Sequence, residues 1–543
     1  MSKKSQKQST ADTTKGRKDG AKKSAKKDEK AQVGPWRKAR ENAEAVLVAI
    51  ILALIIRHFS LEAFEIPTGS MAPALNGVHI QSTCPNCDTT VDIGIETLPS
   101  GHVDNRLNAR KAFLQDEFLY EGNCPDCGCR IEDRTPGQPT QAHCPNCNMK
   151  KPTTPSGFRG PMRLGVITAH CPNCTMSYKE VYEVKPGRFQ FGSDAQGGHK
   201  ILVNKFLYKV REPRRWEVIV FHFNRQRNYI KRLIGLPGET LEVRDGDIWI
   251  NGEIERKPQW AQDELWYQVH DSDIAEQGYV RTKAWRFDKG WKESEEAGFD
   301  FNGLDKSTAM TYQREIRDRV PYSSMSADPH STLPRVYDLR LLANITVNGG
   351  DGQLRLEVIN GDATFACAIP ARAAGTKAEP GSLEARSSDG TRRTELGQLG
   401  DLVLEHKQAY EIEFFVAERQ LVLRVGGETI AEQPLPPEWS DTKKGQNFVR
   451  LVADGVGGVL QRVRVARDNY YTDPNPGFGR PSHGVGGIPA VLGEDDYFAM
   501  GDNSRHSLDS RYWGALHRDN LLGRAFIIFW PALPWHWELG FIR

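Results

Sequence analysis

The chain has 543 residues, and this length excludes a single-core domain and favours three or four structural units. Its 72 basic and 70 acidic residues nearly balance. The balance hides an asymmetry, because the first forty residues hold fourteen Lys or Arg against four Asp or Glu. A basic segment of this kind has almost no apolar side chains to bury, which excludes a folded domain there.

Residues 1–42 are therefore expected to be a disordered basic tail. The apolar stretch at 45–56 is short of the roughly 20 residues of a spanning helix, but flanking residues extend it, so residues 43–61 predict a short or tilted transmembrane helix. A cleaved signal peptide is the alternative, although no small-x-small cleavage site follows at once. The basic tail would stay in the cytoplasm by the positive-inside rule. This anchor explains the basic charge better than nucleic-acid binding does, and we expect no nucleic-acid partner.

Three separated segments carry the chemistry of the chain. Residues 66–75 read IPTGSMAPAL, residues 229–239 read YIKRLIGLPGE, and residues 501–511 read GDNSRHSLDSR. A serine hydroxyl needs an adjacent base to act as a nucleophile, and a lysine can supply that base when burial keeps it neutral. The apolar neighbours of the single lysine in the second segment provide such a setting.

In this order and behind an anchor, the three segments resemble the catalytic core of bacterial type I signal peptidases, which are Ser/Lys serine proteases. The resemblance covers well under half of the chain. It implies an all-β catalytic core, Ser70 as nucleophile and Lys231 as general base. It also implies that Ser507 orients Lys231, and that the Thr68 hydroxyl and the Ser70 N–H form an oxyanion hole. The family more often has Ser where this chain has Thr68.

The resemblance extends to supporting residues and to the substrate. It implies structural roles for Gly501, Asp502, Asn503, Asp509 and Arg511. It implies that the substrate peptide is bound in pockets lined by Ile66, Met71, Leu75, Tyr229 and Ile230. The expected function is cleavage of signal peptides from exported preproteins at the outer face of the bacterial cytoplasmic membrane, without a cofactor for catalysis.

Residues 82–195 hold four Cys-x-x-Cys knuckles, each with Pro after the first Cys: Cys84/Cys87, Cys124/Cys127, Cys144/Cys147 and Cys171/Cys174. Eight such ligands favour two structural zinc ions, with disulfides as the alternative. Cys129 has no assigned partner, and Cys367 is expected to be a buried strand residue.

Spacing predicts which knuckles share a metal. Sixteen residues separate Cys127 from Cys144, within the range of about 15 to 20 for a two-knuckle ribbon. The inner four cysteines therefore form one predicted site, and Cys84/Cys87 and Cys171/Cys174 form a second site around it. The similar flanks VHIQST and GVITAH are expected to lie side by side as strands. Two sequential sites are the alternative.

A second insertion runs from 253 to 487. Its alternating apolar segments predict an antiparallel β-sandwich at about 335–467, and the segment at 395–430 resembles concanavalin-like jelly rolls, which gives little information on a ligand. An earlier region contains Trp260, Trp266, Trp285 and Trp291, which are expected to be core or interface residues rather than a sugar-stacking surface.

The predicted order of units is a tail, an anchor and a three-part catalytic core with two insertions: 1–42, 43–61, 62–81, 82–195, 196–252, 253–487 and 488–543. The expected partners are signal peptides and the lipid bilayer, with a cell-surface ligand of the sandwich unknown. Two alternatives remain. One is a catalytically retired scaffold that binds cell-surface partners through its insertions. The other is a self-cleaving Ser/Lys repressor, which would need an N-terminal helix-turn-helix where this chain has an apolar segment.

Overall fold

A computed structural model gives the fold of the greater part of the chain. The residues that it describes are 36, 39–40, 42–50, 60–94, 115–123, 130–136, 141–143, 150–152, 158–184, 195–223, 227–274, 284–294, 298–322, 333–376, 379–439, 445–472, 483–530 and 540–542. The chain divides into two compact units, Met1–His58 and Phe59–Arg543.

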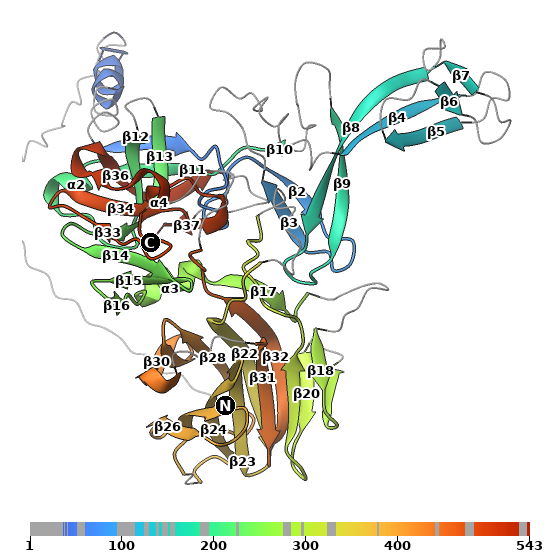
Figure 1. Cartoon of the computed structure of the whole chain (residues 1–543), viewed down its shortest axis with the longest axis vertical. Helices are drawn as coiled ribbons and strands as arrows, with labels where there is room; N and C mark the ends of the chain where they lie inside the picture. The colour runs from blue at the N-terminus through green and yellow to red at the C-terminus, as the bar shows by residue number, and fades with distance from the viewer. Residues whose placement is uncertain are drawn as a thin grey trace, which may run out of the picture. The chain divides into compact units, whose positions relative to one another are not determined.

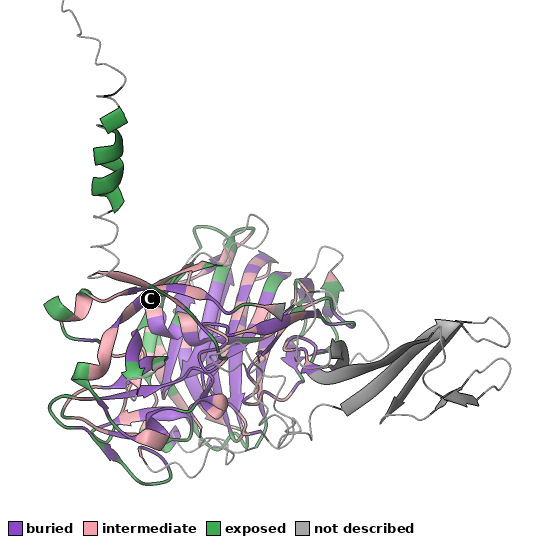
Figure 2. Cartoon of the chain, turned by 90° about the horizontal axis from the view of Figure 1, so that it is seen from above, coloured by how far each residue is buried: buried purple, intermediate pink, exposed green. Residues whose placement is uncertain are grey.

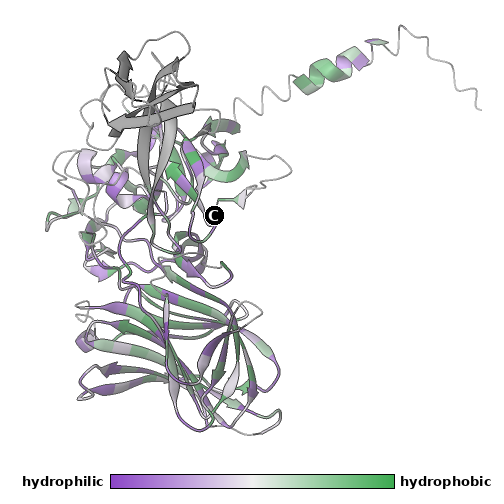
Figure 3. Cartoon of the chain, turned by 90° about the vertical axis from the view of Figure 1, so that its right-hand side faces the viewer, coloured by the Kyte–Doolittle hydropathy of each residue, from purple (hydrophilic) through white to green (hydrophobic). Residues whose placement is uncertain are grey.

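In the first unit, residues 42–50 are helical and exposed, and Figure 3 colours most of them as hydrophobic. No helix among the described residues is long and apolar enough to cross a membrane. Residues 51–59 of the predicted anchor lie outside the described part of the chain. The predicted end of the anchor at residue 61 is wrong, because Leu61 begins strand β1 and pairs with Asn204.

The central element of the second unit is an antiparallel sheet with the order β1-β11-β36-β12-β13-β34-β35, and β37 pairs with β36 (Figure 1). Its strands are β1 Leu61–Glu65, β11 Lys200–Asn204, β12 Val218–Phe223, β13 Arg227–Gly235, β34 Asp496–Met500, β35 Leu516–His517, β36 Leu521–Trp530 and β37 Gly540–Phe541. Strands from the first, middle and last parts of the chain thus share one sheet. The sheet brings the three predicted catalytic segments to one place.

A smaller antiparallel sheet with the order β16-β15-β14-β33 packs beside the central sheet through a shared apolar cluster. Its strands are β14 Thr240–Arg244, β15 Asp247–Ile250, β16 Glu253–Ile254 and β33 Ala490–Val491. Trp216, Ile234 and Phe498 join this cluster from the central part of the chain. The structure therefore agrees with the expected all-β core.

The cysteine-bearing insertion forms three small antiparallel sheets. Their orders are β10-β2-β3, β5-β4-β8-β9 and β6-β7. The strands are β2 His79–Thr83, β3 Thr90–Gly94, β4 Gln115–Asn123, β5 Arg130–Pro136, β6 Gln141–His143, β7 Lys150–Pro152, β8 Phe158–His170, β9 Ser177–Val184 and β10 Ala195–Gln196. The two similar flanks, expected to lie side by side as strands, belong to different sheets, because β2 pairs with β3 and β10 while β8 pairs with β4 and β9. Ile80 of β2 and Ala169 of β8 nevertheless share one apolar cluster.

The second insertion contains two eight-stranded sheets packed face to face. Their orders are β19-β20-β32-β22-β28-β29-β30, with β17 beside β32, and β18-β21-β31-β23-β24-β25-β26, with β27 beside β24. The strands are β17 Tyr267–Asp271, β18 Trp285–Phe287, β19 Trp291–Ser294, β20 Gly298–Asn302, β21 Thr308–Tyr312, β22 Leu339–Gly349, β23 Gly352–Asn360, β24 Ala363–Arg372, β25 Ser382–Ser387, β26 Arg393–Gln398, β27 Leu404–Glu405, β28 Ala409–Ala417, β29 Gln420–Val425, β30 Glu428–Pro434, β31 Asn447–Asp454 and β32 Gly457–Arg467.

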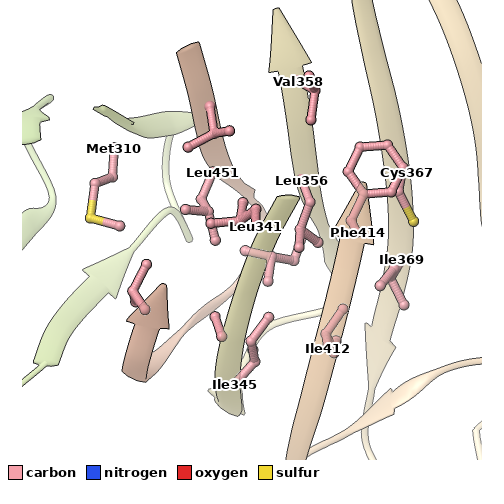
Figure 4. Close-up of a cluster of buried hydrophobic side chains, with 14 of the residues drawn as sticks. Met310, Leu341, Ile345, Leu356, Val358, Cys367, Ile369, Ile412, Phe414 and Leu451 are labelled. Carbon is pink, nitrogen blue, oxygen red and sulfur yellow. The ribbon is translucent and has the colours of Figure 1, made fainter. Parts of the chain in front are cut away.

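Burial alternates along β22, so one face of the sheet contributes to the core. Leu341 and Phe414 from one sheet and Leu356 and Leu451 from the other meet in this core (Figure 4). Buried residues are concentrated in the strands at the centre of the view in Figure 2. Cys367 lies in β24 and is fully buried, as expected.

The predicted start of the sandwich at about residue 335 is wrong. Strands β17 to β21 precede that residue and belong to the two sheets, because β17 and β20 pair with β32 while β21 pairs with β31. The sequence pattern missed them because these strands are short. Trp285 and Trp291 are buried in the sandwich core and Trp266 is buried beside Phe415, which agrees with a packing role.

Candidate active site and cysteine cluster

Ser70 and Lys231 meet at the central sheet. Ser70 lies in a turn after β1, and Lys231 lies near the middle of β13 opposite Ile219 of β12. Lys231 Nζ and Ser70 Oγ are 2.8 Å apart and hydrogen-bonded. Their residues are only 3% and 9% exposed. A serine hydroxyl is thus held against an amine in a largely water-free setting.

The environment of Lys231 favours its neutral form. Burial lowers the pKa of Lys231 to about 8, against the opposing effect of the Asp509 and Asp502 carboxylates. Its Nζ also donates a hydrogen bond to the Ile230 carbonyl oxygen at 2.9 Å, and lies 5.7 Å from the ring centroid of Tyr229. A lysine with this pKa is a usable base at mildly alkaline pH.

The third motif, residues 501–511, holds the backbone directly before and after the Ser70 side chain. The Asn503 N–H donates to the Ser70 carbonyl oxygen and Asn503 Nδ2 donates to the Gly69 carbonyl oxygen, both at 3.0 Å. Gly501 is needed for a close approach, since a Cβ there would lie 2.4 Å from the Ser70 carbonyl oxygen and 2.3 Å from Ser507 Oγ. The turn at 501–503 therefore fixes the position of Ser70.

Ser507 lies beside this turn, but the hydrogen bond to Lys231 that the resemblance implied is not present. Ser507 Oγ is buried without a hydrogen-bond partner among the described residues. Lys231 donates to the Ile230 carbonyl oxygen instead. A buried hydroxyl without a hydrogen bond lowers the stability of the fold. Rotation about one side-chain bond is enough to point a serine Oγ toward a different partner.

Two fully buried ion pairs support the third motif. Asp509 accepts two hydrogen bonds from the Arg511 guanidinium at 2.7 and 2.8 Å, and a third from the Gly501 N–H at 3.0 Å. Asp502 accepts two hydrogen bonds from Arg232, both at 2.8 Å. Arg232 is not among the residues predicted from the sequence. The signal was a second basic residue directly after Lys231 in an otherwise apolar strand, where burial requires a partner.

The predicted oxyanion donors remain available. The Ser70 N–H makes no hydrogen bond to a described residue, and the exposed Thr68 hydroxyl likewise makes none. A catalytic oxyanion hole requires donors that are not engaged in the resting fold.

The residues expected to line substrate pockets lie largely in the protein core. Ile66, Met71, Leu75 and Ile230 are buried together in one apolar cluster of the central sheet. Tyr229 is partly exposed and packs against Phe223 with ring centroids 4.9 Å apart. Ile66, Met71 and Leu75 therefore pack the serine segment, residues 66–75, against Ile230 and the apolar interior of the central sheet.

The sandwich insertion also contacts the serine segment, which sequence reasoning did not foresee. Tyr322 and Tyr267 are buried in a cluster with Ala72, two residues after Ser70. The Tyr322 hydroxyl donates to the Val78 carbonyl oxygen at 3.0 Å, and the Tyr267 hydroxyl donates to the Asp502 carbonyl oxygen at 2.9 Å. Both tyrosines thus tie the second insertion to the catalytic segments.

A second constellation lies in the cysteine-bearing insertion. The thiols of Cys84, Cys87, Cys171 and Cys174 are buried, and their sulfur atoms lie within 4.8 Å of one another. The Cys84–Cys174 and Cys87–Cys171 sulfur distances are both 3.5 Å, far from the roughly 2.05 Å of a disulfide. Four thiols at these separations fit tetrahedral coordination with zinc–sulfur bonds of about 2.3 Å.

The two knuckles of this cluster have the same backbone form. Asp88 and Thr175, each directly after the second cysteine, both have a positive φ, of 56° and 60°. In each knuckle, the carbonyl oxygen of the first cysteine accepts a hydrogen bond from the backbone N–H of that residue. These four cysteines are the predicted outer site. The predicted inner ligands Cys124, Cys127, Cys144 and Cys147, together with Cys129, lie outside the described residues.

Comparison with known proteins shows which family parts of the chain resemble. Residues 192–284 and 429–530 match the family model described as "Signal peptidase, peptidase S26". These ranges include Lys231 and the third motif but not Ser70.

The individual relatives are signal peptidases as well. The chain is 36% identical over 99 residues to the probable signal peptidase I-2 of Synechocystis sp., which is 17% of this chain and 44% of the relative. It is 36% identical over 63 residues to signal peptidase I of Bacillus caldolyticus and to signal peptidase I V of Bacillus subtilis, covering 12% of this chain in each case. The matches cover 35% and 38% of those two relatives, so the chain spans less than half of their lengths.

Solved structures resemble parts of the chain only distantly. A carbohydrate binding module, CBM66 from Bacillus subtilis, has 9% identity and a TM-score of 0.23, covering 33% of this chain and 93% of that module. The exoplasmic/lumenal domain of VIP36 has 9% identity and a TM-score of 0.26, covering 39% and 94%. These scores are too low to support an argument about fold or ligand.

Proposed function

We propose that the chain is a membrane-bound serine endopeptidase that removes signal peptides from exported preproteins. The observation that carries the proposal is the hydrogen bond between buried Lys231 Nζ and Ser70 Oγ at 2.8 Å. The matches to the signal peptidase family support the substrate class.

In the proposed reaction, neutral Lys231 accepts the Ser70 hydroxyl proton while Oγ attacks the scissile carbonyl carbon. The Ser70 N–H and the Thr68 hydroxyl donate hydrogen bonds to the developing oxyanion. Protonated Lys231 then gives its proton to the leaving amine. A water molecule that loses a proton to Lys231 hydrolyses the acyl-enzyme. The Asp509 and Asp502 carboxylates favour the transient positive charge on Lys231.

The proposed location follows from the N-terminal segment. We place a short transmembrane helix within residues 43–60, ahead of β1, with the basic tail in the cytoplasm and the catalytic unit on the outer face. Protease accessibility in sealed spheroplasts tests this topology, because only an outer catalytic unit is digested from outside.

The cysteine-bearing insertion is proposed to hold two structural zinc ions. The cluster at Cys84, Cys87, Cys171 and Cys174 supplies four sulfur ligands and leaves no open position for a substrate. The second ion would be held by the four inner cysteines. Neither ion takes part in peptide cleavage.

The central experiment uses the detergent-solubilised chain and a preprotein with Ala at positions −1 and −3 before the cleavage site. N-terminal sequencing of the product is expected to show one cut after the −1 residue, and the Ser70→Ala variant is expected to give no product. An uncut preprotein with the folded wild-type chain would favour a catalytically retired scaffold instead.

A further inference from the structure

One face of the sandwich carries a pocket that the proposed peptidase reaction does not use. It lies on the sheet β18-β21-β31-β23-β24-β25-β26, on the face that points away from the sandwich core. The cavity has a volume of about 320 Å³. Its lining includes four arginines, namely Arg286, Arg355, Arg386 and Arg450.

Strand register explains why these side chains gather. Arg286 is opposite Thr311, Thr311 is opposite Arg450, and Arg450 is opposite Glu357, so one row of outward-facing residues crosses β18, β21, β31 and β23. Side chains on such a row are neighbours in space. The residues between them, such as Met310 and Leu451, point into the core.

The next row of the same face contains small and apolar residues. Ala309 is opposite Val452, and Val452 is opposite Arg355. Ala309 and Val452 fill less space than the arginines around them, which leaves the hollow open between charged walls. The pocket therefore results from the difference in side-chain size between the row that contains Arg286 and Arg450 and the next row, which contains Ala309 and Val452.

The charge of the pocket is unbalanced. Glu357 is fully buried, and Arg386, Arg450 and Arg355 all lie in ion-pair contact with its carboxylate, the last two at 3.5 Å. The Asp454 carboxylate lies 3.9 Å from Arg355 Nη1, so two carboxylates face these three guanidinium groups. With Arg286 and Asp288 included, the lining holds four basic and two acidic side chains. Arginine stays protonated at any physiological pH, so the excess is permanent.

Some guanidinium donors in the pocket are not used. Arg355 Nε is buried and makes no hydrogen bond, although it lies 3.5 Å from Glu357 Oε1. The side chain of Arg286 is exposed and makes no ion pair or hydrogen bond with any described residue. Buried polar groups normally have partners, so the unused Arg355 donor in the pocket wall points to an acceptor supplied from outside.

We propose that this pocket binds an anionic ligand through a carboxylate or a sulfate-like oxyanion. The planar fork of arginine matches both groups with paired hydrogen bonds. The pocket would give the second insertion a binding function of its own, independent of Ser70 and Lys231.

The test measures binding to the full-length, detergent-solubilised chain by isothermal titration at low ionic strength. The probes are a galacturonate oligomer for carboxylates, sodium sulfate for the oxyanion, and a neutral dextran oligomer as the control. Saturable binding of an acidic probe is expected, with loss of affinity as salt is added. The acidic probe that binds more tightly identifies the preferred group.

Two variants remove pocket charge, Arg286→Gln and Arg450→Gln, and each is expected to weaken binding about tenfold, as loss of one charge-assisted contact does. Arg393→Gln is the matched control, because Arg393 is on the same sheet but does not line the pocket. Arg286→Gln removes no ion pair or hydrogen bond to a described residue, so its unfolding temperature and its rate of peptide cleavage should equal those of the wild type.

The proposal is overturned if neither acidic probe binds. It is also overturned if Arg286→Gln and Arg450→Gln bind as tightly as Arg393→Gln, because the acidic probe would then be held elsewhere on the chain. Cleavage of a signal peptide is measured on the same samples, so failure of the pocket and failure of the proposed peptidase activity are distinguishable.

Discussion

The ring of Tyr322 lies directly against Gly69, the residue before Ser70. A Cβ at position 69 would be 1.9 Å from Tyr322 Cε1, a distance that no side chain tolerates. Tyr322 is 4% exposed, and its backbone oxygen also accepts the Gly94 N–H at 3.2 Å. Tyr322 of the sandwich insertion thus leaves no space for a side chain at position 69.

Gly69→Ala is expected to reduce kcat about 100-fold, because the added methyl group displaces the backbone that carries Ser70 Oγ. Tyr322→Ala removes the atoms that cause the clash. The double variant is therefore expected to be more active than Gly69→Ala alone, a non-additive result that single-turnover cleavage assays detect. Tyr322→Phe is the matched control and should retain the ring contact. Equal activity of the double and Gly69→Ala variants would show that Tyr322 does not position the serine segment.

Ser70→Ala and Lys231→Met are each expected to lower cleavage at least about 1,000-fold, because each removes one half of a nucleophile–base pair. The double variant should be no worse than either single variant. Circular dichroism serves to show that the fold is kept. Wild-type turnover in folded Lys231→Met would remove lysine from the mechanism.

The pH dependence follows from the pKa of Lys231 near 8. Only neutral lysine accepts the serine proton, so kcat/KM should rise tenfold per pH unit below 8 and level off above it. Stability should change as well. Burial lowers the folded-state pKa below the unfolded value of 10.5, so the free energy of unfolding should increase from pH 8 to 10.5 in the wild type but not in Lys231→Met. A flat rate profile across this transition contradicts the assignment.

Replacing Cys84 and Cys87 by Ser is expected to remove about one zinc per chain by elemental analysis, and to lower stability, because the cluster packs with Ile80 and Val91 in a small core. Replacing Cys124 and Cys127 by Ser should remove the other ion and leave the outer site intact. If the second pair of substitutions made Cys84 and Cys87 reactive toward a thiol reagent, the nested arrangement would be wrong.

Deleting residues 335–467 is expected to prevent folding of the sandwich rather than leave a free catalytic core. The deletion removes β32 and β31, so β17, β20 and β21 lose their sheet partners. Their apolar faces would then be exposed, and Tyr267 and Tyr322 would lose support. Limited proteolysis and cleavage of a soluble peptide test this outcome. A stable, fully active deletion variant would show that the insertion is dispensable.

The sequence was sufficient to predict the all-β core. It also singled out Ser70, Lys231 and the Asp509–Arg511 pair, because short motifs of defined residue types can be recognised without knowledge of the tertiary packing. It also separated the outer cysteines from the inner ones by spacing. The start of the sandwich could not be found, since strands as short as β18 have too few residues to establish an alternating pattern.

Contacts between distant segments were also beyond the sequence. Tyr322 approaches Gly69, and Tyr267 reaches Asp502, only because the two sheets of the insertion fold beside the catalytic segments. Nothing local to a tyrosine indicates such a partner. The state of Ser507 was missed for a related reason, since a motif names the residue but not the rotamer of its hydroxyl.

The buried Arg232–Asp502 pair has a consequence for errors in folding. Lys231 and Arg232 are successive residues of β13 and point to opposite faces of the sheet. A slip of β13 by one position would present a guanidinium, which never gives up its proton, to the serine hydroxyl. The same slip would leave Asp502 buried without its two hydrogen bonds from Arg232. The ion pair therefore destabilises the misaligned register relative to the native one, and the misaligned register would be catalytically inactive.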